Sequence, residues 1–579
     1  MFGKSKDPSV SRAALGEDLA RVMPNDGIPW YKKKHLVILN YYAISMGLLA
    51  AANGMDGSLM NGLMALPQWY NFMDNPSGAW LGFINAIQPL SSALGYPVVA
   101  YFANRWGRKK GLLVGYFFVT LGALLQAFTP NTTGFILGRL FLGQPSAWWG
   151  GLAPLLITEL AYPSHRGFLT ALYNSGWYVG STLAAWATYG TRNYTNDWAW
   201  RIPSILQLAI PLVVLPAALL IPESPRYLIA NGKIAEARHI FTQYHAGNDE
   251  QSLLVEFEMT EIERAIESEK TANNSTSWMD LVSTPGNRHR TFISVTLGIF
   301  ANWNGVGVVS YYLAKVLDTV GITSVTDQTL ISGCLQVWNL IIAVLAAALV
   351  DRLGRRPLFL ISSVGMLISH VLISGLSGSF ATTGNASTGL AVVPFLYIYY
   401  GFYDIAFTPL IVSYPAEVWS YQLRARGIAI TQLSTYAAIF FNTFVNPIAL
   451  DAIGWKYYIV FAVILVIITV TIYFSYPETK GHSLEEMAQI FDKDQAAVTG
   501  HEVTKEVLQS NHLEKTLINI SPKLSLHYHT PLQIGNNVYL GDVVSNNEAN
   551  PENPFSAGFY KQTKGEPPES SGIASQGVK

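Results

Sequence analysis

Long apolar runs alternate with short polar connections over most of this 579-residue chain. A helix that crosses the lipid core of a membrane needs about 20 mainly apolar residues. Twelve runs reach that length, at 37–57, 80–103, 111–129, 134–158, 168–189, 202–221, 292–316, 329–350, 357–378, 392–415, 427–449 and 456–476. The pattern therefore predicts an all-α membrane protein with twelve transmembrane helices.

A set of three motifs occurs twice, in the same order, where apolar runs meet polar loops. The motifs are a Gly-Arg turn, a Glu with an Arg seven residues later, and a Pro-Glu pair. The first copy holds Gly107-Arg108, Glu159 with Arg166, and Pro222-Glu223; the second holds Gly354-Arg355, Glu417 with Arg424, and Pro477-Glu478. Each motif is separated from its counterpart by 247 to 258 residues. This spacing indicates an internal duplication.

The duplication divides the chain into two pseudo-symmetric six-helix bundles, predicted at 37–221 and 291–476. Between them we expect a cytosolic helical loop at 222–290, because its apolar residues follow a helical period. The ends, 1–36 and 477–579, are polar and are expected to be cytosolic tails. The composition of the second tail predicts that it is largely disordered.

Lys and Arg are distributed unevenly between the two sets of loops. The loops after the first, seventh and ninth predicted spans contain neither residue, whereas the Gly-Arg turns and the 222–290 loop contain many. Positive charge favours the cytosolic side, so both termini are predicted to be cytosolic. Three glycosylation sequons then fall on the outer side, at Asn131, Asn193 and Asn385.

Composition excludes several classes of protein. Only 13% of the residues are charged, against about 25% in an average soluble protein. The net charge of −1 gives no reason to expect a nucleic-acid partner. The single cysteine, Cys334, excludes a disulfide within the chain, and we expect it to be buried. Because no metal-ligand spacing, nucleophile elbow or phosphate loop is present, we expect no enzyme, cofactor or metal site.

The repeated motifs resemble those of the sugar porters of the major facilitator superfamily. Gly138-Arg139, Pro154 and Tyr311-Tyr312 match the same family, and the resemblance covers roughly residues 35–490. The sequence around Asp56 and the segment Val445-Asn446-Pro447 are most similar to the corresponding sequences of the fungal lactose and cellodextrin permeases. The resemblance implies a transporter that works by alternating access.

The charged residues of the repeated motifs are expected to form a cytosolic gate. Each exposed ion pair contributes only about 0–1 kcal/mol, but a network of several can bias one closed state. The alternative is that the positive charges only fix the topology. The predicted gate consists of Arg105, Arg108, Glu159, Arg166, Glu223, Arg226, Asp351, Arg355, Arg356, Glu417, Arg424 and Glu478.

Asp56 is the leading candidate for proton coupling. An acid at bilayer depth is energetically costly and is a functional candidate for that reason. In the resembled family, proton-coupled members carry an acid in this motif, and Arg139 matches the family arginine expected to pair with it. The alternative is a structural acid that caps a turn around Gly57. For a second membrane acid, Asp404, we expect a buried hydrogen-bonding role.

A sugar site needs amides and hydroxyls for the sugar hydroxyls, and an aromatic ring for the apolar face of the sugar. We expect the site to include Asn174, Asn302, Trp303, Asn304, Asn339 and Tyr436. The alternative for each polar residue is a hydrogen bond between helices. Two glycines, Gly305 and Gly307, permit a break in the seventh span. The chain departs from the pattern of the hexose carriers at several positions; for example, Val412 stands where those carriers have a tryptophan. Such departures are consistent with a wider binding site or with a protein that no longer transports.

Together these features predict a multi-pass plasma-membrane symporter that moves a sugar inward with a proton and acts as a monomer. A disaccharide such as lactose or cellobiose is favoured, and a hexose is possible. The alternatives are a passive sugar facilitator and a sugar sensor that does not transport.

Overall fold

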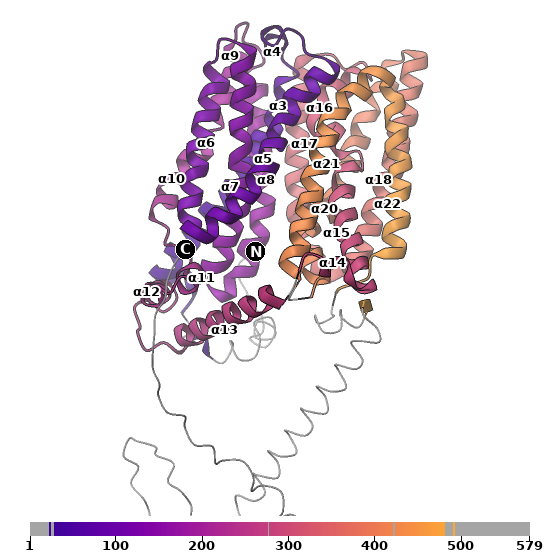
Figure 1. Cartoon of the computed structure of the whole chain (residues 1–579). Helices are drawn as coiled ribbons and strands as arrows, with labels where there is room; N and C mark the ends of the chain where they lie inside the picture. Colours follow the sequence, from indigo (N-terminus) through magenta and orange to yellow (C-terminus); the bar gives the residue numbers. More distant parts are fainter. Residues whose placement is uncertain (1–21, 25–27, 276, 421–422, 481–489, 492–579) are drawn as a thin grey trace, which may run out of the picture. The chain divides into compact units, whose positions relative to one another are not determined.

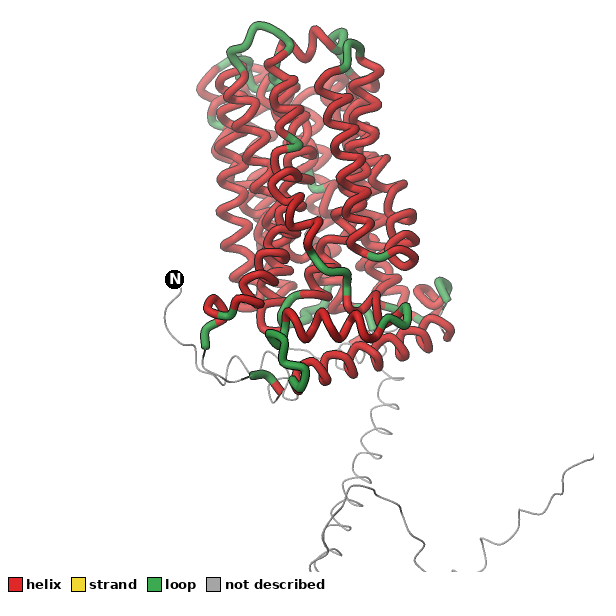
Figure 2. Tube along the Cα trace, turned by 90° about the vertical axis from the view of Figure 1, so that its left-hand side faces the viewer, coloured by secondary structure: helices red, strands yellow, loops and turns green. Residues whose placement is uncertain are grey.

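The computed structural model describes residues 22–24, 28–275, 277–420, 423–480 and 490–491. Most of the residues in the two expected tails, 1–36 and 477–579, are therefore not described. The disorder predicted for the second tail concerns residues outside the described ranges. The described secondary structure is entirely helical, as Figures 1 and 2 show. The prediction of an all-α chain is confirmed.

All twelve predicted spans are helical. The first half contains α3 (Lys34–Leu63), α5 (Gly78–Trp106), α6 (Arg108–Phe128), α7 (Thr132–Leu160), α8 (Pro163–Thr191), α9 (Trp198–Leu206) and α10 (Ala209–Leu220). The second half contains α15 (Pro285–Trp303), α16 (Val306–Asp318), α17 (Val325–Leu353), α18 (Arg355–Thr383), α20 (Val392–Val418), α21 (Arg424–Ile453) and α22 (Tyr457–Ser475). The twelve-helix major facilitator architecture is confirmed, with the sixth and seventh spans each divided into two helices.

Eight segments of the described chain are long and apolar enough to cross a membrane, and the last of them contains both α21 and α22. The other three spans, α5, α7 and α8, are also of membrane-crossing length, at 29 residues each. These three helices carry several polar side chains each. They supply most of the residues with which the first half lines the two inner cavities. Cys334, expected to be buried, is exposed on α17.

The two Gly-Arg turns have matching backbone geometry. Gly107 has φ 97° between α5 and α6, and Gly354 has φ 95° between α17 and α18. Such positive φ values favour glycine. In each half the turn lies against the glutamate of the Pro-Glu motif, Glu223 or Glu478. The end of the molecule that carries these turns is called the Glu–Arg end below.

The break in the seventh span lies at Gly305, as predicted. Its φ of 101° is left-handed, a conformation that glycine adopts without strain. The side-chain oxygen of Asn304 accepts a hydrogen bond from Val306 N at 2.9 Å, and its carbonyl accepts one from the Tyr399 hydroxyl at 2.7 Å. These bonds satisfy backbone groups that the interrupted helix leaves free.

Four short helices follow the sixth span: α11 (Pro225–Ala230), α12 (Ile234–Tyr244), α13 (Leu253–Ser275) and α14 (Asp280–Ser283). Figure 1 shows α13 running across the ends of the spanning helices, at the Glu–Arg end. Phe241 on α12 packs with Leu228 on α11 and with Val255 and Met259 on α13. The helices α11, α12 and α13 share this small apolar core and are called the loop domain below, whereas Leu281 on α14 packs with Trp419 and Leu423.

At the opposite end lie α4 (Pro67–Phe72) and α19 (Ala386–Leu390), and here the two halves are joined. The Asn61 side chain on α3 accepts a hydrogen bond from Leu313 N on α16 at 2.9 Å. Asp451 on α21 accepts from Gly78 N on α5 at 2.7 Å. Arg192, after α8, donates to Thr326 on α17 at 3.3 Å. One continuous apolar cluster also includes residues of both halves at this end.

Candidate functional site

Asp56 on α3 is buried in the membrane interior, with 5% of its surface exposed. The side chain of Gln88 on α5 donates to Asp56 Oδ2 and accepts from Arg139 Nη2 on α7, the latter at 2.9 Å. Arg139 also donates through Nε to the Ile84 carbonyl at 3.3 Å. The predicted pairing of Asp56 with Arg139 is therefore mediated mainly by a glutamine that the sequence had not singled out.

The direct distance between the charged groups of Arg139 and Asp56 is long for an ion pair. Arg139 Nη1 lies 4.0 Å from Asp56 Oδ1, and neither atom has a hydrogen-bond partner among the described residues. A buried polar atom without a partner is energetically unfavourable by about 1–3 kcal/mol. The pair therefore offers one free acceptor and one free donor to a proton, a water molecule or a hydroxyl group.

A cavity of about 120 Å³, called the polar chamber, lies beside this pair. Its lining combines hydroxyl, amide and guanidinium groups from both halves of the chain. The polar side chains in this lining include Asn85, Gln88, Ser92, Arg139, Tyr311 and Thr443. Gln88 and Arg139 thus contact both the buried carboxyl group and the cavity.

A second cavity of about 300 Å³, called the aromatic chamber, is lined by Asn53, Tyr96, Tyr173, Trp177, Gln432 and Tyr436, among others. It lies nearer the Glu–Arg end, because Asn53 precedes Asp56 along α3 while Pro154, another lining residue, follows Arg139 along α7. Ser146, Trp177 and Tyr436 line both chambers. Aromatic faces beside amide groups suit a solute with an apolar face and several hydroxyls.

Two tyrosines separate the chambers. The Tyr96 hydroxyl on α5 lies 2.5 Å from the Tyr436 hydroxyl on α21, and the ring centroids are 4.7 Å apart. The Tyr96 hydroxyl also approaches the Ser146 carbonyl at 3.4 Å. This contact joins the two halves beside the wall that the chambers share, since Tyr436 lines both chambers and Tyr96 lines the aromatic chamber.

Asp404 on α20 forms a second contact between the halves. Its Oδ1 accepts from the Tyr178 hydroxyl on α8 at 2.5 Å and from Thr408 Oγ1 at 2.8 Å. Its other oxygen, Oδ2, has no partner among the described residues. The buried, hydrogen-bonded position expected for this acid is thus observed.

Of the predicted binding residues whose side chains the structure describes, Tyr436 lines both chambers, whereas the lining of neither chamber includes Asn302, Trp303, Asn304 or Asn339. Asn302 donates to the Gly298 carbonyl at 3.0 Å, and Trp303 donates to the Ala438 carbonyl at 3.1 Å. Asn304 stabilises the helix break, as described above. Asn339 is fully buried, and neither side-chain polar atom has a partner within the described structure. Asn174 lies on α8, but its side chain is outside the described set.

The Glu–Arg pairs of the two halves have the same geometry. Arg108 contacts both carboxylate oxygens of Glu159, at 3.0 and 3.1 Å. Arg355 likewise contacts both oxygens of Glu417, at 2.8 and 3.1 Å. Each pair links helices of one half, α6 with α7 and α18 with α20.

The Pro-Glu glutamates cap helices. Glu223 accepts from the backbone N–H groups of Arg108 and Lys109 at 2.9 and 3.2 Å. Glu478 accepts from those of Arg355 and Arg356 at 2.9 and 3.1 Å. A carboxylate at the first turn of a helix satisfies free N–H donors and complements the helix dipole. These residues hold the turns at the beginnings of α6 and α18.

The remaining gate candidates are at the same end. Arg105 is exposed, and its carbonyl accepts from the Tyr227 hydroxyl at 3.1 Å. Arg356 donates to the Tyr473 carbonyl at 2.7 Å. Arg166, Arg226 and Arg424 lie at this end as well, and each of them interacts with other residues there. The side chain of Asp351 is not among those that the structure describes. The sequon residues Asn131, Asn193 and Asn385 are exposed at the opposite end.

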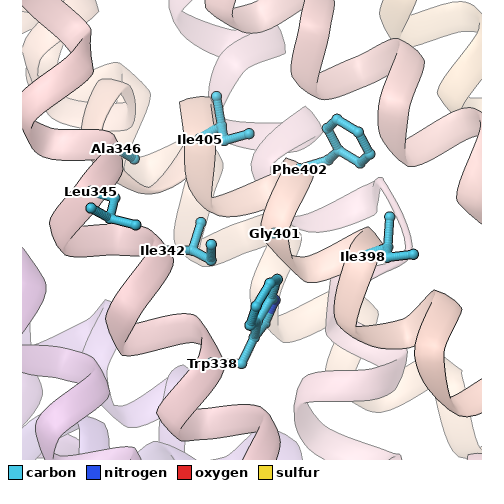
Figure 3. Close-up of a pocket in the computed structure, with 8 residues that line it drawn as sticks. All are labelled: Trp338, Ile342, Leu345, Ala346, Ile398, Gly401, Phe402 and Ile405. Carbon is cyan, nitrogen blue, oxygen red and sulfur yellow. The ribbon is translucent and has the colours of Figure 1, made fainter.

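A third cavity, of about 300 Å³, lies between α17 and α20 (Figure 3). Trp338, Phe402 and aliphatic side chains line it, and the Trp338 indole N–H is already bonded to the Tyr397 carbonyl at 2.8 Å. The lining of this cavity is almost entirely apolar, so a hydroxylated solute fits it less well than the polar and aromatic chambers.

Comparison with known proteins places these observations in one family. Residues 42–491 match the family model described as "Sugar (and other) transporter". The chain is 30% identical to the MFS-type transporter oryC of Aspergillus oryzae, over 74% of this chain and 79% of the relative. It is 26% identical to a high-affinity glucose transporter of Kluyveromyces lactis, over 80% of this chain and 87% of that relative.

A solved structure of the proton:xylose symporter XylE, bound to 6-bromo-6-deoxy-D-glucose, has the same fold. The TM-score is 0.63 at 22% identity, and the match covers 79% of this chain and 99% of the other. The predicted twelve-helix architecture, the duplicated Glu–Arg motifs and these matches agree. The chain belongs to the sugar (and other) transporter family of the major facilitator superfamily, and it is a multi-pass membrane transporter and not an enzyme.

Proposed function

We propose that this transporter moves a sugar across the plasma membrane together with a proton, by alternating access, as a monomer. The observation that carries the proposal is the Asp56–Gln88–Arg139 group, in which a buried carboxyl group keeps one oxygen free beside a polar chamber. An ionisable group inside a membrane bundle is energetically costly and marks proton and substrate pathways. The xylose symporter with the same fold is proton-coupled according to its description.

The geometry suggests how a proton at Asp56 changes the helix contacts. Ionised Asp56 accepts from Gln88 and attracts Arg139, so α3, α5 and α7 are held together by one charged network. A proton on Asp56 removes the negative charge but leaves Arg139 bonded to Gln88 and to the Ile84 carbonyl. If these contacts differ between the two orientations, proton affinity differs too, and the two are linked by thermodynamic necessity.

Contacts between the halves support alternating access. The halves are bonded at the end opposite the Glu–Arg end, through Asn61 with Leu313 and Gly78 with Asp451. The larger chamber lies on the Glu–Arg side of the Tyr96–Tyr436 contact. We assign this arrangement to an inward-facing state, with the basic loops and both termini in the cytosol. The rocking bodies are then the bundles 37–221 and 291–476, with the 222–290 loop between them.

The two chambers favour a disaccharide over a single hexose. Each chamber offers groups suited to one sugar ring, since the polar chamber carries amides and hydroxyls and the aromatic chamber carries Tyr173 and Trp177. They share a wall at Ser146, Trp177 and Tyr436, so parting the tyrosines joins them. The similarity of the motifs to those of lactose and cellodextrin permeases points the same way. The glucose transporter among the relatives makes a hexose the next substrate to test.

Uptake of labelled mono- and disaccharides in a cell that lacks its own sugar carriers tests the proposal. Uptake of one disaccharide should be faster at acidic than at neutral external pH, and a protonophore should abolish accumulation above the external concentration. Accumulation that never exceeds equilibrium and ignores the protonophore would identify a passive facilitator. Specific binding without flux of any sugar would identify a sensor.

A further inference from the structure

A buried histidine joins the loop domain to the spanning helices. His245, at the end of α12, is only 3% exposed. Its Nδ1 lies 2.7 Å from Glu258 Oε2 on α13, and its Nε2 lies 3.1 Å from the carbonyl oxygen of Leu160. Glu258 is equally buried, and Leu160 is the last residue of α7. One imidazole ring thus contacts α13 inside the loop domain and the end of the spanning helix α7.

The two hydrogen bonds of His245 can form together only if the ring and Glu258 hold one more proton than they hold when they are apart. A backbone carbonyl only accepts hydrogen bonds, and so does an ionised carboxylate. A neutral imidazole has one N–H group, so it cannot donate to both Glu258 and Leu160. Both bonds form only when the ring is protonated, or when Glu258 carries a proton and donates it to Nδ1. Either arrangement holds one proton more than a neutral histidine beside an ionised glutamate.

The surroundings of the ring favour such a proton. Leu160 ends α7, and the free carbonyls at a helix C-terminus attract a cation. The groups that face the ring from the other sides are the aromatic side chains of Tyr162, at 5.5 Å, and of Phe241, at 5.0 Å. Beyond Tyr162 lies His165, whose ring is 5.7 Å from that of Tyr162. The one carboxylate in direct contact is Glu258.

We propose that His245, Glu258 and the Leu160 carbonyl form a proton-binding site, distinct from Asp56, that docks the loop domain onto α7 according to pH at the Glu–Arg end. The bond from Nε2 to Leu160 is the one lost on deprotonation, since a neutral ring keeps its single proton on Nδ1 for the carboxylate. The residue immediately before Leu160 on α7 is Glu159, which pairs with Arg108. Docking therefore acts directly beside one of the two Glu–Arg pairs.

The sign of the pH dependence follows from proton uptake. Docking binds a proton, so it strengthens as pH falls and weakens as pH rises. One proton per docking event limits the change to about tenfold per pH unit. The site thus responds to cytosolic acidification if the Glu–Arg end is cytosolic.

Hydrogen exchange of the full-length protein in lipid nanodiscs tests the site, after correction for the intrinsic effect of pH on exchange. Between about pH 8 and about pH 6, protection of the α12 amides should rise by up to about tenfold per pH unit. Two matched controls lie on the same helices: His239 on α12 and Glu256 on α13 are exposed. His239→Gln and Glu256→Gln should keep the pH dependence of the parent protein.

Glu258→Gln separates the proton site from a merely structural role. Its amide can donate to Nδ1 while a neutral ring donates from Nε2 to Leu160, so both bonds form without an added proton. This variant should stay docked and lose the pH dependence, whereas His245→Gln should be less protected at every pH. Protection in the parent protein that does not change with pH, or a Glu258→Gln variant that keeps the parent's pH response, would overturn the proposal.

Discussion

Arg139 Nη1 stands 4.0 Å from Asp56 Oδ1 inside the first bundle, and neither atom is hydrogen-bonded to any residue that the structure describes. The amide of Gln88 bridges the rest of the pair, donating to the acid and accepting from the arginine. An opposite charge that is close but not in direct contact leaves the carboxyl group free to gain and lose a proton. This relationship is the basis of the proposed coupling.

Replacing Asp56 by Asn should abolish accumulation of sugar against a gradient. The amide keeps the size of the side chain but cannot exchange a proton, so the driving force is lost while the sugar site remains. Counterflow exchange of labelled for unlabelled sugar in proteoliposomes should continue at a reduced rate. Uphill accumulation equal to that of the parent would remove Asp56 from the coupling.

Asp404→Asn is the matched control for this experiment. It changes a second buried acid, one that is occupied by hydrogen bonds from Tyr178 and Thr408. An amide oxygen still accepts both bonds, so accumulation should persist. Loss of accumulation in this variant, with Asp56→Asn unaffected, would transfer the coupling role to α20.

The Tyr96–Tyr436 contact should influence the binding of long substrates only. A neutral hydrogen bond contributes about 0.5–1.5 kcal/mol, so its removal should tighten the binding of a solute that must break it by about two- to tenfold. Tyr96→Phe and Tyr436→Phe should each show this gain for a disaccharide, and the double variant should show no more. Affinity for a monosaccharide should not change.

Equilibrium binding of the two sugars to the four proteins measures this effect. Equal gains for both sugars, or additive gains in the double variant, would show that the tyrosines do not divide the site between two rings.

Sequence patterns predicted the fold well because each spanning helix is specified locally, by its own apolar length and by glycine at the tight turns. The break at Gly305 and the matching turns at Gly107 and Gly354 are of this kind. The pairing of Asp56 with Arg139 was expected from the resemblance to the sugar porters, because Arg139 matches the arginine of that family, and the bridging role of Gln88 was not foreseen.

The lining of the chambers could not be predicted in the same way. Gln88, Tyr96 and Trp177 look like ordinary polar or aromatic residues of a membrane helix, and only the packing of α5 against α21 and of α8 against α3 reveals where they point. One signal was present, since Asn53 lies three residues before Asp56 and so shares its helix face. Conversely, the amides of Asn302 and Asn304 serve the helix backbone beside Gly305.

Breaking one Glu–Arg pair should slow transport without weakening sugar binding. Arg108 and Glu159 are 11% and 6% exposed, and they make two charged hydrogen bonds. Such bonds contribute about 1.5–3 kcal/mol, so Glu159→Gln should reduce the maximal uptake rate about tenfold or more. Glu417→Gln should act in the same direction in the second half.

The loop domain supplies a control for the gate variants. Glu236 pairs with Lys233 at the exposed surface of α12, and exposed pairs contribute little. Glu236→Gln should leave the uptake rate and the sugar affinity unchanged. A similar loss of rate in Glu236→Gln and Glu159→Gln would mean that the Glu–Arg pair has no special role in the gate.

Glu478 should make the stability of the second half depend on pH. Partial burial raises the pKa of Glu478, but the backbone N–H groups around it outweigh this and hold the pKa below its usual value; they belong to Lys480, Arg355, Arg356 and Thr479. A lowered pKa means that the stabilisation is present above about pH 4.3, the ordinary value for glutamate, and is lost as pH falls through the folded value.

Thermal unfolding of detergent-solubilised Glu478→Gln tests this sign. The variant should unfold at a lower temperature than the parent at neutral pH, and the difference should shrink as the solution is acidified. A difference that stays constant down to about pH 3.5, below the ordinary glutamate value, would show that the charge of Glu478 does not contribute.

Sugar-evoked proton movement tests the central claim most directly. Adding the transported sugar to a lightly buffered suspension of cells or proteoliposomes that contain the protein should raise the external pH, because protons enter with the sugar. The same addition to Asp56→Asn should give no pH change, although sugar still equilibrates. Sugar entry at the parent rate without any change in external pH would contradict proton-coupled transport.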